Sequence, residues 1–161
     1  MADVQAAFVK AGCANVTTYI ASGNVIFDAP AGAAGELRGR VTRAMRQLLG
    51  AEPVIVYRTC RELQALVDSA PFGTLTQDRA IKLYVAFALE KGKGTPTFPL
   101  SFAKEELEAI GTVKNDVLIV SRRKSNGMYG FPNNWIEKAL GVVATARNWS
   151  TVTKLAELTR I

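Results

Sequence analysis

The stretch Ala144-Thr145-Ala146-Arg147-Asn148-Trp149-Ser150-Thr151-Val152-Thr153-Lys154-Leu155 predicts the junction between a short apolar strand and the last helix of the chain. Asn148 suits the N-cap of that helix, because its side-chain oxygen can accept hydrogen bonds from free backbone N–H groups of the first turn. Trp149, Val152 and Ala156 share one helical face. We expect Trp149 to be a packing anchor, because large aromatic side chains are usually buried.

Outward from this junction, residues 81–148 predict a mixed unit of strands and helices. Residues 81–89 are apolar on both faces, which is typical of a strand in the interior of a sheet. Residues 106–113 and 117–120 predict a hairpin, because Lys114-Asn115-Asp116 between them suits a turn. The remaining expected elements are a short helical turn over 100–105, a helix over 132–140 and a strand over 142–144. This is the order of a split β-α-β-β-α-β unit.

Residues 3–57 predict the same order without its opening strand. The expected elements are a helix over 3–11, a hairpin of residues 15–21 and 25–27 turning at Ser22-Gly23-Asn24, a helix from about Ala33 or Glu36 to Leu49, and a strand over 53–57. Thr59 and Glu62 then have the spacing of a capping box, which predicts the start of a further helix.

Three segments carry a resemblance to a known family. They are Tyr19-Ile20-Ala21-Ser22-Gly23-Asn24-Val25-Ile26-Phe27, Glu137-Lys138-Ala139-Leu140-Gly141, and the run from Thr145 to Leu155. In order and spacing, over nearly the whole chain, they resemble the family filed as domain of unknown function 1697. The resemblance implies two ferredoxin-like α+β repeats packed together, and it implies no activity.

We therefore expect an α+β protein of two ferredoxin-like β-α-β-β-α-β repeats. Residues 1–72 form the first repeat, which lacks its opening strand, and residues 73–161 form the second repeat with the C-terminal helix. Family members typically open with a strand carrying an Arg-Gly-Ile-Asn motif, so the resemblance implies either a chain that starts late or a gap filled by rearrangement or another subunit. Many members also carry a basic-Ser-Lys run where this chain has Met128-Tyr129-Gly130.

Composition narrows the possible chemistry. The chain has 161 residues, which suits one domain or two small ones, and it contains no histidine, which excludes histidine-based triads, imidazole zinc ligands and a histidine general base. The sequence shows no cofactor motif and no metal-ligand pattern, so we expect neither a cofactor nor a metal. Without a signal peptide or an apolar run of ~18 residues, a cytoplasmic location without membrane association is expected.

Charge points to an anionic partner. The net charge is +6 and the pI is about 9.5, which is in the range of nucleic-acid-binding domains. One candidate site is the start of the last helix, where an anion such as a nucleotide or nucleic acid could meet the backbone N–H groups and positive charge of Arg147, Asn148, Ser150, Thr151 and Lys154. The alternative is that Asn148 and Arg147 only cap and brace the fold.

A second basic run follows the strand over 117–120. Arg122, Arg123 and Lys124 precede a loop with Tyr129 and Phe131, and basic residues beside aromatic ones can bind single-stranded nucleic acid. The alternative is a solvated strand end followed by aromatic residues that turn into the core.

Two other classes of function stay open. A small-molecule enzyme without histidine would need carboxylates, lysine, tyrosine or cysteine, but Asp28, Glu62, Asp78 and Asp116 are expected to be structural or exposed, and no catalytic residue is identified. A structural or oligomeric protein, such as a homodimer, could form through the sheet edge that the missing strand leaves unpaired.

Overall fold

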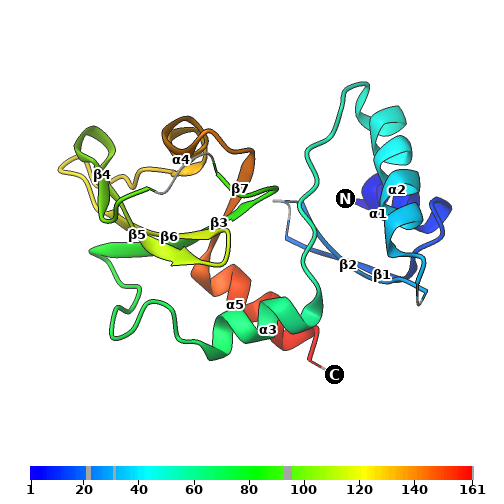
Figure 1. Cartoon of the computed structure of the whole chain (residues 1–161), viewed down its shortest axis with the longest axis horizontal. Helices are drawn as coiled ribbons and strands as arrows, with labels where there is room; N and C mark the ends of the chain where they lie inside the picture. Colours follow the sequence, from blue (N-terminus) through cyan, green and yellow to red (C-terminus); the bar gives the residue numbers. More distant parts are fainter. Residues whose placement is uncertain (21–22, 31, 93–95, 161) are drawn as a thin grey trace. The chain divides into compact units, whose positions relative to one another are not determined.

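The computed structural model describes residues 1–20, 23–30, 32–92 and 96–160. The chain forms two compact units, residues 1–55 and residues 56–161 (Figure 1). Each is a mixture of helices and strands, as the sequence predicts, and the protein is α+β.

The described residues of the first unit form two helices and one hairpin. Its elements are α1 (Ala2–Lys10), β1 (Ala14–Tyr19), β2 (Asn24–Asp28) and α2 (Ala34–Leu49). The hairpin of β1 and β2 is antiparallel, with Tyr19 opposite Asn24, which confirms the predicted pairing. Of the predicted turn, Ser22 lies outside the described residues, and Gly23 adopts a left-handed φ of 82° that suits glycine.

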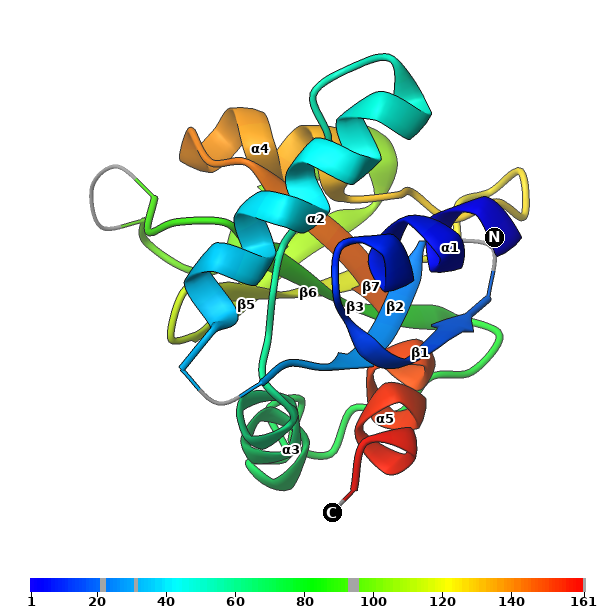
Figure 2. The ribbon, with the colours of Figure 1, turned by 90° about the vertical axis from the view of Figure 1, so that its right-hand side faces the viewer.

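Apolar side chains of both helices and of the hairpin form one core in this unit. Figure 2 shows α1 and α2 side by side, and the two helices are in contact. Phe8 of α1 meets Phe27 of β2 edge-on, with ring centroids 5.4 Å apart, while Leu37 and Val41 of α2 are fully enclosed. The apolar side of α2 therefore faces this core.

The strand expected over residues 53–57 is wrong, because residues 52–59 take no regular structure. In the predicted repeat this segment would pair with the opening strand, and no such strand is among the described residues. An extended segment without a neighbour cannot complete a hydrogen-bonded ladder, whatever its β-propensity.

The second unit is built on a five-stranded antiparallel sheet with the order β4-β5-β6-β3-β7. Its elements are α3 (Cys60–Asp68), β3 (Ile81–Ala88), β4 (Leu100–Phe102), the 3₁₀ turn η1 (Ala103–Glu105), β5 (Leu107–Val113), β6 (Asp116–Arg122), α4 (Asn133–Leu140), β7 (Ala144–Asn148) and α5 (Trp149–Leu158). The predicted interior strand is β3, which lies between β6 and β7.

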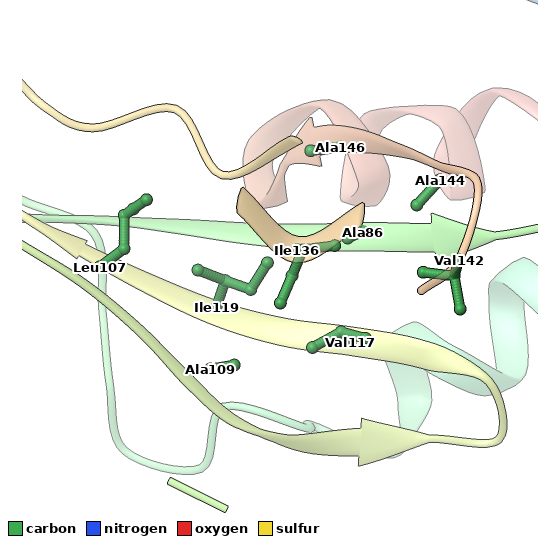
Figure 3. Packing of buried hydrophobic residues seen from close by; sticks show 9 residues of the cluster. All are labelled: Ala86, Leu107, Ala109, Val117, Ile119, Ile136, Val142, Ala144 and Ala146. Atoms are coloured by element: carbon green, nitrogen blue, oxygen red, sulfur yellow. The ribbon is translucent and has the colours of Figure 1, made fainter. Parts of the chain in front are cut away.

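Helices cover both faces of this sheet (Figure 1). On one face, Ile136 of α4 packs onto Ala86, Ile119 and Ala146 of the sheet (Figure 3). On the other face, Leu66 of α3 and Val152 of α5 belong to a core with side chains of β3 and β6. Trp149 packs against this second core and meets Phe72 edge-on at 5.1 Å between centroids, as expected of an anchor.

Three boundaries differ from the predicted ones. Residues 100–105 begin as strand β4 and only end as a 3₁₀ turn, and the last strand lies at Ala144–Asn148 rather than at 142–144. The compact units join at residues 55 and 56, whereas the expected repeats join at 72 and 73. The reason is α3, which packs against α5 and so belongs to the second unit.

Candidate anion-binding site

The start of α5 is closed by side chains of the fold itself. Oδ1 of Asn148 accepts hydrogen bonds from the backbone N–H of Ser150 at 3.0 Å and from Oγ of Ser150 at 2.6 Å. Nδ2 of Asn148 donates to Oε1 of Gln77 at 2.7 Å, and the same oxygen accepts from the backbone N–H of Leu83 at 2.9 Å. Asn148 is therefore the N-cap that the sequence predicts, and it also ties the end of β7 to the loop before β3.

Arg147 and Lys154, also expected around this helix start, have partners within the fold. Nη1 of Arg147 donates to Oγ1 of Thr145 at 2.5 Å and to the backbone oxygen of Ala146 at 2.9 Å. Burial lowers the pKa of the Arg147 guanidinium from its ordinary value, yet an arginine keeps its charge. Nζ of Lys154 pairs with Glu157 at 2.9 Å. Thr151, on the first turn, is half-buried.

The predicted site residues form two separate groups in the structure. Arg147 lies opposite Val85 on β3, whereas Arg122, at the end of β6, lies opposite Ile81. Four residues of strand separate these positions, or about 13 Å at ~3.3 Å per residue, and β6 and β7 lie on opposite sides of β3. Arg122 and Arg123 therefore do not join the start of α5.

Arg122 and Arg123 instead line a shallow surface hollow of ≈ 540 Å³. The other lining residues are Arg79, Ala80 and Ile81, which lead into β3. We call this feature the arginine hollow. Arg79 is the residue that sequence reasoning missed, because it lies in a loop more than forty residues before Arg122. The antiparallel pairing of β3 with β6 brings the start of one strand beside the end of the other, and that places the three arginines together.

Backbone and side-chain contacts hold the rim of the arginine hollow in place. The backbone N–H of Arg123 donates to the oxygen of Ala80 at 2.8 Å, and its Nε donates to the oxygen of Gly127 at 3.2 Å. Oδ1 of Asp78 accepts from the N–H groups of Ala80 and Ile81 at 2.6 and 2.9 Å, and these hydrogen bonds lower the pKa of the Asp78 carboxyl. The rim is therefore ordered by bonds that do not use the guanidinium groups of Arg79 and Arg122.

The charge of the hollow is only partly balanced. Within the part of the chain that the structure describes, Arg79 and Arg123 have no carboxylate at ion-pairing distance. Arg122 pairs with Glu108 at a long 3.6 Å, with about half of the Arg122 side chain exposed. Three arginines outnumber the carboxylates of Asp78 and Glu108 nearby, so the hollow keeps a net positive charge.

The acidic residues considered for catalysis all have structural roles. Asp28 accepts from Nδ2 of Asn15 at 2.6 Å, and Asp116 forms an enclosed ion pair with Arg58. Glu62 completes the predicted capping box with Thr59, whose backbone N–H lowers the pKa of the Glu62 carboxyl. Among the described residues, no three His, Cys, Asp or Glu side chains gather where they could hold a metal ion, and both cysteines are free.

No helix in the described ranges has the length and apolar character that crossing a membrane requires.

Comparison with known proteins finds no matching curated protein and no matching solved structure. The profile of one family, described as protein of unknown function (DUF1697), matches residues 1–117, which is well over half of the chain. The chain therefore belongs to the DUF1697 family.

Proposed function

We propose that this protein, acting in the cytoplasm, binds a phosphate-bearing anion at the arginine hollow. The observation that carries the proposal is that Arg79, Arg122 and Arg123 all line one open hollow at the end of the sheet. The planar guanidinium group presents paired donors that match two oxygens of a phosphate, and three such groups suit a ligand with more than one phosphate.

The arginine hollow is favoured over the start of α5 for a physical reason. At α5 the side chain of Asn148 already occupies the N–H of Ser150, and Arg147 donates to Thr145 and Ala146. An anion there would have to compete with bonds that the fold already makes. At the hollow, Arg79 and Arg122 can turn toward a ligand without breaking a bond that holds the backbone.

Inorganic polyphosphate, titrated calorimetrically at several salt concentrations, tests this function. Substituting Arg79→Gln or Arg123→Gln should weaken binding roughly fivefold to tenfold each, because each removes a charged hydrogen-bond donor. The affinity of the wild-type protein should fall as salt rises, because exposed charges are screened.

Two substitutions with the same loss of charge are the controls. Arg43→Gln changes an exposed position on α2 of the other unit, and Lys154→Gln changes α5. Both should leave affinity near the wild-type value. Equal losses from Arg43→Gln would show non-specific attraction, loss from Lys154→Gln alone would move the site to α5, and no salt-dependent binding by the wild type would end the proposal.

A second candidate function, homodimer formation through a sheet edge, rests on the first unit. Its described sheet has only β1 and β2. A bulge between Ala14 and Thr17 disturbs the edge of β1, but β2 is regular and its five residues include no lysine, proline or glycine, the residues that usually protect an edge. We propose that both units derive from the ferredoxin-like repeat, since in the second unit β3 lies between β6 and β7 as that repeat requires. We also propose that β2 of the first unit pairs with β2 of a second copy.

Size-exclusion chromatography with light scattering tests the homodimer. Val25 and Phe27 pack against the core of the first unit, so Ile26 between them points to the opposite face and can be changed without opening that core. Ile26→Lys should convert a concentration-dependent dimer to a monomer, because lysine on an edge opposes pairing. Thr17→Lys, on the facing strand, should leave the dimer intact. A wild-type protein that stays monomeric at all concentrations contradicts this candidate.

A further inference from the structure

We infer that the anion is a single-stranded polynucleotide, with a base stacked on Phe131 and its phosphates on the arginine hollow. This inference rests on the proposed binding function and names its class of ligand. It comes from the segment of residues 128–131, which runs beside the hollow and carries two aromatic side chains.

The segment is joined directly to the rim of the hollow. Tyr129 forms an antiparallel bridge with Arg123, so the two side chains are cross-strand neighbours on one face. The hydroxyl of Tyr129 donates to the backbone oxygen of Arg79 at 2.7 Å. The aromatic segment is thus continuous with the part of the rim that Arg79 and Arg123 form.

Gly130 sets how closely the segment approaches the sheet. Its backbone oxygen accepts from Oγ of the buried Ser121 at 2.8 Å, and a Cβ at this position would lie 2.3 Å from the backbone oxygen of Glu105. Only glycine allows that approach. Because side chains alternate along an extended segment, Tyr129 and Phe131 both emerge on the side opposite to this contact.

Phe131 is held in place but open to solvent. Its ring meets Tyr84 edge-on, with centroids 5.7 Å apart and planes at 88°, yet 61% of the residue is exposed. Tyr84 itself is half-buried, and burial is the main reason that the pKa of its hydroxyl is raised. A fixed aromatic ring with an open side is the platform on which an unstacked base packs.

Positive charge surrounds these rings. Nζ of Lys82 lies 5.5 Å from the centroid of the Tyr129 ring, two residues before Tyr84 on the same face of β3. Together with Arg79 and Arg123, it makes a basic rim around two aromatic side chains, whereas Arg122 lies on the other face of β6. A polynucleotide supplies both chemistries in alternation, because phosphates match the cations and bases match the rings. In a duplex the bases are already stacked, so the single strand is the form that fits.

Fluorescence anisotropy with end-labelled probes of equal length tests the inference. The probes are oligo-uridine RNA, oligo-thymidine DNA, an abasic DNA strand and a DNA duplex. The wild-type protein should bind the RNA or the DNA single strand at least fivefold more tightly than the abasic strand and the duplex. A preference for RNA or for DNA would assign the source, and equal binding of both would support the inference for single strands in general.

Phe131→Ala isolates the stacking contribution. It should weaken binding of the single strands roughly fivefold to thirtyfold, as expected for the loss of one base–aromatic contact, and leave inorganic polyphosphate binding unchanged. Met128→Ala is the matched control, since Met128 is 62% exposed in the same segment but has no ring, and it should change neither affinity.

The results distinguish failure of this inference from failure of the proposed anion-binding function. If the abasic strand binds as tightly as the single strands and Phe131→Ala has no effect, the anion site stands and base recognition is refuted. If neither polyphosphate nor any oligonucleotide binds, both proposals fail together.

Discussion

Arg58 and Asp116 form an ion pair that is largely withdrawn from solvent, with side chains 23% and 11% exposed. The guanidinium contacts both oxygens of the carboxylate, and its Nη2 also donates to the backbone oxygen of Ala88 at 2.9 Å. The ring of Phe87 lies under it, with its centroid 5.5 Å from the guanidinium carbon. Arg58 therefore fixes the start of β6, at Asp116, against the end of β3, at Ala88.

At the same scale, Arg58→Met should lower the free energy of unfolding by about 2–4 kcal/mol, because it leaves Asp116 buried without its counter-charge. Arg122→Met is the control, since its pair with Glu108 is exposed, and it should cost less than about 1 kcal/mol. Urea unfolding followed by tryptophan fluorescence measures both. Similar small losses for the two variants would show that the Arg58 pair contributes no more than a surface contact.

At the scale of elements, the position of the segment 128–131 depends on Gly130, which has no side chain. Gly130→Ala should destabilise the second unit by about 1–3 kcal/mol, because the added methyl group meets a backbone oxygen that cannot move away as a side-chain tip can. Gly111→Ala on β5, with no atom within 4 Å of the added carbon, should change stability far less. Denaturant midpoints of the two variants test this, and equal midpoints would refute the close approach.

Some elements are predictable from sequence signals within a few residues, and others are not. The sequence predicts the capping box of Thr59 and Glu62, the N-cap Asn148 and the hairpin of β5 and β6, because each depends on residues close together in the chain. The same kind of signal predicts a strand over residues 53–57, and there the prediction is wrong. A strand needs a neighbour, and the neighbour is not a local property.

At the scale of the whole molecule, the two units should differ in stability. The first has 55 residues and a two-stranded sheet, and small domains bury a smaller share of their surface. Both tryptophans, Trp135 and Trp149, lie in the second unit, whereas the buried Cys13 lies in the first, so the two unfolding events have separate probes.

In a Cys60→Ser variant, labelling of Cys13 by a thiol reagent should rise at a lower urea concentration than the tryptophan signal changes. In the folded unit the reaction should be slow, because burial raises the pKa of the Cys13 thiol, although the charge of Arg40 opposes that rise. Coincident curves for the two probes would instead mean that the units unfold as one.

In the candidate site, too, residues close together in the chain are predictable from the sequence and distant ones are not. The sequence indicates Arg122 and Arg123 as a basic run beside aromatic residues, but no local pattern indicates Arg79. Only the register of β3 against β6 brings Arg79 to Arg122 and keeps Arg147 away. That register depends on which apolar faces pack together.

By itself, the sequence determined the α+β class, the helix starts, the hairpins and the absence of histidine chemistry, because these follow from composition and from neighbours along the chain. The tertiary structure alone decided that residues 53–57 stay without a ladder, that α3 belongs to the second unit, and that three arginines meet at one hollow. These features depend on strand pairing and packing between residues far apart in the chain. A local sequence pattern contains no information about the free energy of such contacts.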